Sequence, residues 1–321
     1  MRFILWSVTP ALLLLALFEG LGYWRGFEPE TWAVLDADLG YRMRHPRFVP
    51  PAPDPVDLVM IGDSITFAMG KPAPGTVNLS GVGFGTDQEL ILLERHLADL
   101  KRVDRVVLNF SLSNDFIDNV SAVNPHDGFR PKSYFTLEGD GLELHREHLR
   151  VSGWDRTLLW LNQRSGSVFL VRELSGRGRA SSRSEPFRFQ GDADLPSDEQ
   201  WQRYDTLRES SLPLTGRLLE RMARTVEDRL RARFAVLVFP SNYPPAENPL
   251  QMPEKVRAFF AGFDFPVEDL GCHAARRGMA YPDLAYDPLG HLTQRGKQLA
   301  AEVIATLPGD RGAASPCRIA P

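Results

Sequence analysis

The chain reads Val-Asp-Leu-Val-Met-Ile-Gly-Asp-Ser at residues 56–64. A short apolar run that ends at glycine is typical of a strand buried on both faces of a parallel sheet. Three later runs of similar character predict further strands, at 76–80 (TVNLS), 104–113 (DRVVLNFSLS) and 233–241 (RFAVLVFPS).

Helical patterns separate or follow these runs. Thr86 and Glu89 have the spacing of a capping box and open a predicted helix in which leucines recur at helical intervals. Residues 218–231 are predicted as an amphipathic helix and residues 293–307 as a closing helix. Strands that alternate with helices predict an α/β fold whose parallel sheet is covered on both faces.

The pattern breaks between about residues 120 and 210. This region holds a hairpin-like piece (SYFTLEGDGLELH, 133–145), an apolar stretch and a Gly/Ser/Arg-rich loop. The predicted strands on either side fit one sheet, so we interpret the region as an insertion into a single domain spanning 56–308. Residues 25–55, which end in a proline-rich stretch, are interpreted as a spacer, and residues 309–321 as a C-terminal tail.

The overall composition excludes two broad classes. Of the 321 residues, 43% are hydrophobic and 24% charged, with a formal net charge of -4. These values argue against a disordered chain, and the absence of a dominant basic surface argues against a nucleic-acid partner. The two cysteines, Cys272 and Cys317, are too few for a disulfide scaffold and are not spaced for a metal site. The sequence is compatible with one disulfide between them in an oxidising compartment.

Residues 1–24 predict a transmembrane signal-anchor. The run 3–18 (FILWSVTPALLLLALF) carries no charge, and the stretch continues past Glu19 to Trp24. A helix over the whole stretch would be about 33 Å long, close to the thickness of a bilayer core. A cleaved signal peptide is the first alternative, but the small-x-small cleavage site is poor. A buried core helix is the second, and its terminal position and uniform apolarity argue against it.

The orientation of this anchor is less defined by the sequence. Arginines that follow the segment at positions 25, 42, 44 and 47 oppose export of the body under the positive-inside rule. Long domains, however, cross a membrane largely regardless of their charge. We expect a single-pass protein whose catalytic domain is periplasmic or extracellular.

Three polar features fall where predicted strands end, and an open α/β sheet binds its ligands at that edge. Ser64 follows the first strand in Gly-Asp-Ser, Gly83 lies in the glycine-rich loop 78–85, and Asn114 follows the third strand. Backbone N–H groups and a carboxamide can stabilise an oxyanion. Taken singly, each feature is more often structural: Asp63 or Ser64 as a helix N-cap, the glycines as a tight turn, Asn114 as a local turn.

A histidine lies before the closing helix. A serine nucleophile needs a base, and the base needs an acceptor that orients it. His291 provides the base, and Asp287, four residues earlier, is the favoured acceptor. Asp283 is the runner-up, and a plain Asp-Pro turn at 287–288 is the structural alternative.

Together and in this order, the four features resemble the signature blocks of the SGNH/GDSL hydrolases. The resemblance covers about residues 56–120 and 233–307, and it implies a flavodoxin-like three-layer α/β/α sandwich with a parallel sheet. It further implies that Ser64 is the nucleophile and His291 its base. The oxyanion hole would comprise the N–H groups of Ser64 and Gly83 and the carboxamide of Asn114.

The sequence departs from this family at two positions. Leu112 stands where the third block usually has glycine, and Pro288 stands where the last block, D-x-x-H, has its acid. Family members with an N-terminal anchor, a large insertion and an N-D-F-x-D-N third block, which here is 114–119, look similar to this chain throughout.

The resemblance implies a serine esterase that works through an acyl-enzyme, without a cofactor or a metal. The expected substrate is an acylated small molecule or an envelope polysaccharide from which small acyl groups are removed. Two alternatives remain: an O-acyltransferase acting on a polysaccharide, and a catalytically silent polysaccharide-binding protein.

Overall fold

The structure is a computed structural model. It describes residues 13–22, 24, 34–36, 39–42, 51–124, 130–139, 141–146, 149, 165–167, 198–242, 246–307 and 315–319. The single domain predicted over 56–308 falls largely within these ranges, whereas much of its predicted insertion and of the predicted membrane anchor lies outside them.

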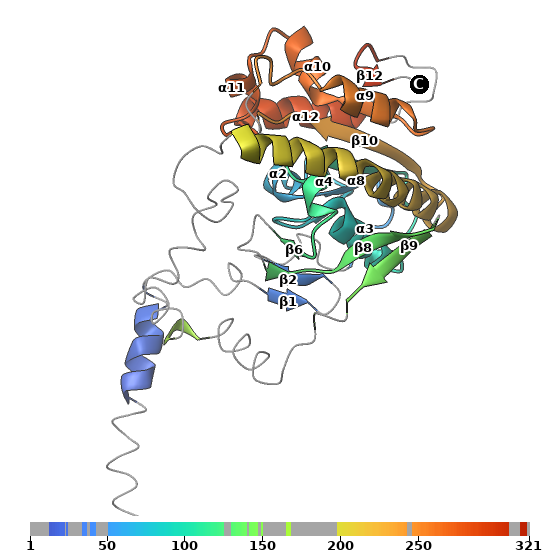
Figure 1. Ribbon diagram of the computed structural model, residues 1–321. Helices are drawn as coiled ribbons and strands as arrows, with labels where there is room; N and C mark the ends of the chain where they lie inside the picture. The colour runs from blue at the N-terminus through green and yellow to red at the C-terminus, as the bar shows by residue number, and fades with distance from the viewer. Residues whose placement is uncertain are drawn as a thin grey trace, which may run out of the picture.

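A six-stranded sheet forms the centre of the body (Figure 1). Its strands, in spatial order, are β12 (Arg318–Ile319), β11 (Val267–Asp269), β10 (Arg233–Phe239), β5 (Arg105–Ser111), β3 (Leu58–Gly62) and β4 (Thr76–Ser80). Neighbouring strands are parallel except for β12, which pairs antiparallel with β11 at one edge. The predicted α/β fold with a mostly parallel sheet is confirmed, and all four predicted strands are present.

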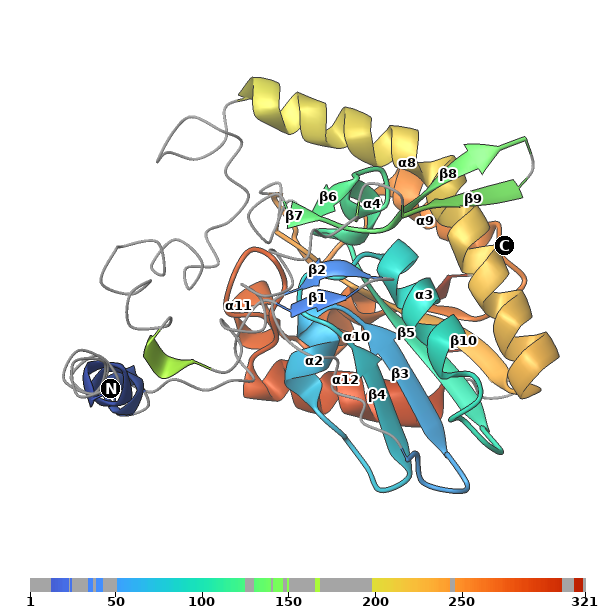
Figure 2. The same cartoon turned by 90° about the horizontal axis from the view of Figure 1, so that it is seen from below.

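Helices cover both faces of this sheet (Figures 1 and 2). One face carries α3 (Thr86–His96), α4 (Asp115–Asp118), α8 (Asp198–Thr225) and α9 (Glu254–Ala261). The other carries α2 (Ser64–Met69), α10 (Leu270–Arg276), α11 (Tyr281–Leu284) and α12 (Gln294–Thr306). This arrangement is consistent with a three-layer sandwich.

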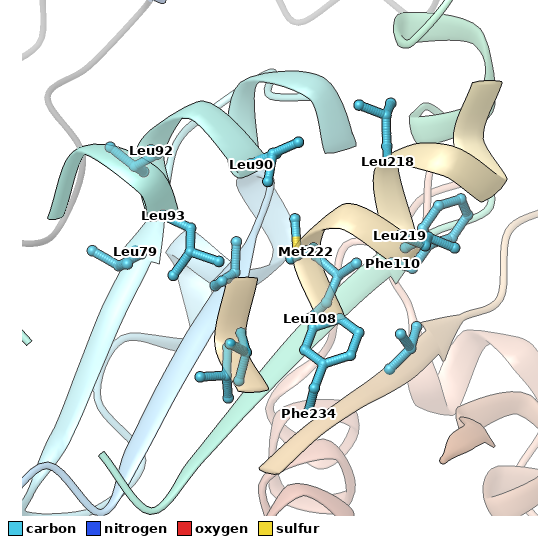
Figure 3. Close-up of a cluster of buried hydrophobic side chains, with 14 of the residues drawn as sticks. Leu79, Leu90, Leu92, Leu93, Leu108, Phe110, Leu218, Leu219, Met222 and Phe234 are labelled. Atoms are coloured by element: carbon cyan, nitrogen blue, oxygen red, sulfur yellow. The ribbon is translucent and has the colours of Figure 1, made fainter. Parts of the chain in front are cut away.

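The alternation of side chains along the strands builds two separate cores. Val59 and Ile61 of β3 belong to the first core, whereas Leu58 and Met60 belong to the second. The same alternation is seen along β5 and β10, because successive side chains of a strand point to opposite faces. Figure 3 shows part of the first core, where α3 and α8 pack over the sheet. Its labelled residues are Leu79, Leu90, Leu92, Leu93, Leu108, Phe110, Leu218, Leu219, Met222 and Phe234.

Smaller elements surround this body. They are β1 (Val34–Asp36), β2 (Gly40–Arg42), β6 (Val123–Asn124), β7 (Arg130–Pro131), β8 (Tyr134–Glu138), β9 (Gly141–His145) and the π-helical turn η3 (Val226–Leu230). The antiparallel pair of β8 and β9 confirms the predicted hairpin. Part of the predicted spacer packs against the body, since Asp36 pairs with Arg95 of α3 at 2.6 Å and Leu39 is fully buried.

Two helix predictions need correction. The predicted capping box at Thr86 is wrong, because Gly85 is the N-cap and no side chain caps α3. Thr86 instead donates a hydrogen bond to Asp115 at 3.3 Å, so its hydroxyl faces the interior. The helix predicted over 218–231 is longer, since α8 begins at Asp198 and η3 continues it to Leu230.

The order of the strands creates a reversal point in the sheet. Numbered along the chain, the five parallel strands β3, β4, β5, β10 and β11 lie in the order 2-1-3-4-5. From β3 the chain passes to β4 on one side of it, and from β4 it returns to β5 on the other side of β3. Ligands of open parallel sheets bind beyond the carboxyl ends of the strands at such a point.

The two ends of the chain are described only in part. Residues 13–22 are helical, with Leu13 and Leu17 66% and 58% exposed, and the rest of the predicted anchor, residues 1–12 and 23, lies outside the described residues. Among the described residues, no helix combines the length and the apolarity needed to cross a bilayer. Within the predicted C-terminal tail, β12 joins the sheet and Cys317 forms a disulfide with Cys272 of α10.

Candidate active site

The turn after β3 presents Ser64 at the start of α2. Asp63 is the N-cap of this short helix, and its Oδ1 accepts a hydrogen bond from Ile65 N–H at 2.8 Å, as predicted for that residue. Glycine is required at position 62, because a Cβ there would lie 2.1 Å from Thr66 Oγ1. The tight turn leaves the Ser64 side chain half-buried beyond the carboxyl end of β3.

His291 meets Ser64 across 227 residues of sequence. Ser64 Oγ lies 2.9 Å from His291 Nε2. On the other side of the ring, His291 Nδ1 lies 2.6 Å from Asp287 Oδ2, and His291 N–H donates to Asp287 Oδ1 at 3.0 Å. The three side chains therefore form one continuous chain of hydrogen bonds, and the carboxylate contacts both the imidazole and the backbone of His291.

Asp283, the second candidate for the acid, has other partners. Its carboxylate accepts a hydrogen bond from Ala280 N–H at 2.9 Å and lies 3.3 Å from Arg295. These contacts stabilise the first turn of α11. Of the two acids weighed from the sequence, the structure brings only Asp287 to His291.

Tyr281 braces the loop that carries His291. Its hydroxyl donates toward the carbonyl oxygens of Asp287 and Pro288 at 3.0 and 3.2 Å, and it accepts a hydrogen bond from Asn242 N–H at 3.2 Å. Burial raises the pKa of Tyr281 well above the usual range of a phenol. Sequence reasoning missed this residue, because its partners are backbone groups on a different loop and carry no sequence signal.

Gly83 and Asn114 lie on the loops that follow β4 and β5. Gly83 has a φ of 71°, a left-handed conformation that glycine adopts readily. Asn114 immediately precedes α4, and its Nδ2 lies 3.3 Å from the carbonyl oxygen of Phe84, the residue after Gly83. The two loops named from the sequence are thus in contact beside the Ser64 turn, where Gly81 N–H donates to the Gly62 carbonyl at 3.1 Å.

Asn78, which begins the second sequence block, has a supporting position. Its Nδ2 donates to the carbonyl oxygens of Thr66 and Gly70, at 3.0 and 2.6 Å, and its Oδ1 accepts a hydrogen bond from Ser80. Asn78 therefore ties β4 to both ends of α2. Leu112, which replaces the usual glycine of the third block, is buried and its N–H donates to Phe239 of β10 at 3.2 Å.

Buried carboxyl groups lie beneath this site. Asp63, Asp87, Glu89, Asp115 and Asp118 are all at most 2% exposed, and Lys132 is fully buried and paired with Asp87. Sequence reasoning did not foresee this group, because polar residues in predicted helices are normally assigned to the solvent face.

The members of the third block connect the site to its surroundings. Asp115 accepts hydrogen bonds from Ser111 N–H at 2.5 Å and from Thr86, and the amide of Asn119 joins Asp87 N–H to Thr215 of α8. The Asn114 carboxamide itself donates to the carbonyl oxygen of Phe84 and accepts a hydrogen bond from the Ser113 hydroxyl at 3.2 Å. The block N-D-F-x-D-N is thus a polar framework beside Asn114 that joins β5, α3 and α8.

The buried carboxyl groups beneath the site have strongly shifted pKa values. Burial raises the pKa of Glu89, Asp115 and Asp118 well above the usual range, and neighbouring carboxylates add to the shift. Both carboxyl oxygens of Glu89 are buried without a hydrogen-bond partner among the described residues. A carboxyl group in such surroundings favours its neutral, protonated form.

The pKa values of His291 and Asp287 shift in opposite directions. Burial alone would lower the pKa of His291, but the hydrogen bond and charge of Asp287, with the charge of Asp63, outweigh it and raise that pKa. For Asp287, burial is outweighed by the hydrogen bonds and charge of His291, so its pKa falls below the usual value. Asp287 is therefore ionised at neutral pH.

Comparisons with known proteins do not indicate a family for this chain. Neither protein-family models nor curated proteins give a significant match to the chain. Among the described residues, no group of three or more His, Cys, Asp or Glu side chains is arranged to hold a metal ion. The arrangement at Ser64 can nevertheless carry out chemistry by itself, because it contains a hydroxyl, a base and an orienting carboxylate in hydrogen-bonding sequence.

Proposed function

We propose that the protein is a serine ester hydrolase of the SGNH/GDSL type. The observation that carries this proposal is the hydrogen-bonded sequence Ser64, His291 and Asp287. The site also lies where the strand order reverses between β3 and β5, and the order 2-1-3-4-5 is that of flavodoxin-like sheets. A catalytically silent protein would have no need for three side chains held in these contacts.

In the proposed mechanism, Ser64 Oγ attacks the carbonyl carbon of the ester while its proton passes to His291 Nε2. The oxyanion of the tetrahedral intermediate is stabilised by the N–H groups of Ser64 and Gly83 and by the carboxamide of Asn114. When the bond to the alcohol breaks, the alcohol oxygen takes the proton from His291. Asp287 holds the Nδ1 proton of His291 throughout, which leaves Nε2 as the acceptor.

Water then completes the cycle. His291 takes a proton from water as the resulting hydroxide attacks the acyl carbon, and Ser64 Oγ leaves with that proton when the acid is released. If a sugar hydroxyl takes the place of water, the same residues perform acyl transfer. We propose small acyl groups on a carbohydrate or an envelope polysaccharide as the substrate, on the strength of the resemblance to the SGNH family and the apolar N-terminal segment.

The test of the reaction is the variant Ser64→Ala assayed with p-nitrophenyl acetate. Hydrolysis should fall to background, because alanine has no hydroxyl to form the acyl-enzyme, while the unfolding temperature stays close to that of the wild type. A fluorophosphonate probe should label the wild type and not the variant. Ser210→Ala, at an exposed serine of α8, is the matched control and should keep activity and labelling. Wild-type hydrolysis by Ser64→Ala would rule out the proposal.

We further propose that residues 1–24 anchor the protein in a membrane and that the body lies outside the cytoplasm. The apolar run supports the anchor, and the disulfide between Cys272 and Cys317 supports an oxidising compartment. A C-terminal alkaline phosphatase fusion should be active, and a green fluorescent protein fusion exported through the general secretion route should be dark. The opposite pair of results would place the body in the cytoplasm.

A further inference from the structure

An exposed aromatic ring lies directly beside the base. Tyr286 is 69% exposed, and its ring stacks on the imidazole of His291 with 5.9 Å between ring centroids and an interplanar angle of 16°. Tyrosine side chains usually bury their rings, so an open face next to a reactive group calls for an explanation.

The main chain of Tyr286 is held in place by its neighbours. Tyr286 N–H donates to the carbonyl oxygen of His291 at 2.9 Å, and the adjacent residues Ala285 and Leu292 form a β-bridge. Tyr286 also precedes Asp287, the carboxylate that contacts His291. The loop between α11 and α12 therefore positions the aromatic ring, the carboxylate and the imidazole as one unit.

The surroundings of this ring are polar. Outside the N-terminal segment 13–24, the other exposed large hydrophobic residues in the described chain are Val120 and Leu137, at 38% and 42%. Tyr286 is the most exposed of the three. On its own loop it adjoins a carboxylate, and Ser241, whose hydroxyl donates to Pro288 at 3.1 Å, borders the same loop. A long acyl chain needs a continuous apolar surface, which these residues do not provide.

A sugar ring is complementary to an aromatic ring in polar surroundings. A pyranose presents C–H groups on one face, which pack on an aromatic face, and hydroxyl groups at its edge, which need polar neighbours. The partial burial of Tyr286 and the charge of Asp287 raise the pKa of its phenol above the usual value, so the ring stays neutral at the pH where His291 works.

We propose that Tyr286 is the platform on which the alcohol part of the ester, a pyranose ring, stacks while its acyl group reacts at Ser64. This inference rests on the proposed esterase function and adds to it a residue that selects carbohydrate esters. Because the platform adjoins the base that protonates the leaving oxygen, it would hold the sugar on the leaving-group side of the scissile bond.

The test compares two acetate esters, glucose pentaacetate and vinyl acetate. The alcohol part of vinyl acetate is too small to cover the tyrosine ring. In the wild type, kcat/KM should be higher for the sugar ester. Tyr286→Ala should lower the ratio of the two kcat/KM values about tenfold, with the loss falling on KM for the sugar ester. Tyr286→Phe and Tyr286→Trp, which keep an aromatic face, should retain the ratio within about threefold.

Three outcomes would overturn the inference. In the first, Tyr286→Ala keeps the wild-type ratio. In the second, both esters lose kcat by the same factor and the pH profile shifts, which would show that the ring acts on His291 rather than on the sugar. In the third, Tyr286→Phe loses as much as Tyr286→Ala, which would assign the effect to the hydroxyl. If the wild type hydrolyses neither ester and Ser64 is not labelled by the phosphonate, the esterase proposal itself fails, and this inference with it.

Discussion

At the scale of single residues, the contact between His291 and Asp287 determines how the site responds to pH. A general base must be neutral to accept a proton, and the pKa of His291 is raised above its ordinary value of 6.5. In the free enzyme, kcat/KM should therefore be low at acid pH and rise through the pKa of His291, with a midpoint above that ordinary value. Asp287 stays ionised across this range, because its own pKa is lowered.

Replacing Asp287 should change both the rate and the pH at which kcat/KM rises. Asp287→Asn removes the charge and the Nδ1 acceptor that raise the pKa of His291, while the burial that lowers it remains. We expect kcat at neutral pH to fall by about 10³–10⁴, as when a triad loses the acceptor that sets its tautomer. The acid limb of the residual activity should move to lower pH in a kcat/KM profile.

Asp283→Asn is the matched control for that experiment. Its carboxylate contacts Ala280 and Arg295 instead of the imidazole, so its removal should leave the pH profile in place. A severe loss in Asp283→Asn with a nearly silent Asp287→Asn would assign the orienting role to the other acid. Two silent variants would mean that Ser64 and His291 act as a dyad.

At the scale of secondary-structure elements, the sequence predicts strands better than helix ends. The strand predicted at 76–80 matches β4 residue for residue, and the hairpin of β8 and β9 falls inside the segment named for it. Both carry a strong local signal, in β-branched residues or in a turn between alternating residues. Strand β11 is only three residues long, and so short a run has no periodicity to detect.

The start of α3 shows why local rules fail at this site. Thr86 and Glu89 have the spacing of a capping box, yet Thr86 bonds Asp115 and Glu89 is fully buried. The partner of Thr86 comes from α4, which is distant in sequence, and Glu89 is buried with no hydrogen-bond partner among the described residues. The triad contact between Ser64 and Asp287–His291 was predictable through the family resemblance, whereas the polar framework beneath it depends on packing that no local pattern reports.

The ion pair of Lys132 and Asp87 should contribute strongly to holding α3 in place. Both side chains are fully buried, so Lys132→Met leaves an uncompensated carboxylate in the core. We expect this variant to lose about 3–5 kcal/mol of unfolding free energy, measured by urea denaturation at pH 7. The double variant Lys132→Met with Asp87→Leu should recover part of that loss, because neither charge remains buried.

Lys255→Met provides the surface control. Lys255 pairs with Glu209 at 2.6 Å, but its side chain is 75% exposed, so the urea midpoint should hardly move. Equal losses in the two lysine variants would contradict a special role for the buried pair. A double variant less stable than Lys132→Met alone would do so as well.

At the scale of the whole molecule, the site depends on both cores. Ile65 beside Ser64 and Leu292 beside His291 pack in the core under α10 and α12, whereas Phe116 near Asn114 packs in the core under α3 and α8. The sheet between these cores therefore sets the distance between Ser64 and Asn114, the proposed nucleophile and oxyanion donor. Disturbing either helical layer should affect catalysis as well as stability.

The disulfide closes a segment of chain that contains the loop of Asp287 and His291. Cys272 and Cys317 are separated by 45 residues, and Asp287 and His291 lie between them. In the chain-entropy model, a cross-link that closes a loop of this length stabilises the folded state by up to about 4 kcal/mol. Replacing both cysteines with serine should lower the unfolding free energy in urea by about 2–4 kcal/mol.

Reduction supplies the control for that variant. Wild-type protein in dithiothreitol should unfold at the urea midpoint of the double serine variant, and the variant itself should not respond to dithiothreitol. A variant as stable as oxidised wild-type protein would show that the pairing of β12 with β11 is sufficient to hold the C-terminal segment.

The separation of 227 positions between Ser64 and His291 also sets an order of events during synthesis. The ribosome makes Ser64 well before His291. At about 5–20 residues per second, a growing chain passes roughly 10–45 s with its nucleophile made and its base not yet translated. On the proposed function, a chain released by a stop codon before position 291 would contain Ser64 without His291, so we expect such incomplete products to be inert toward esters in whatever compartment they reach.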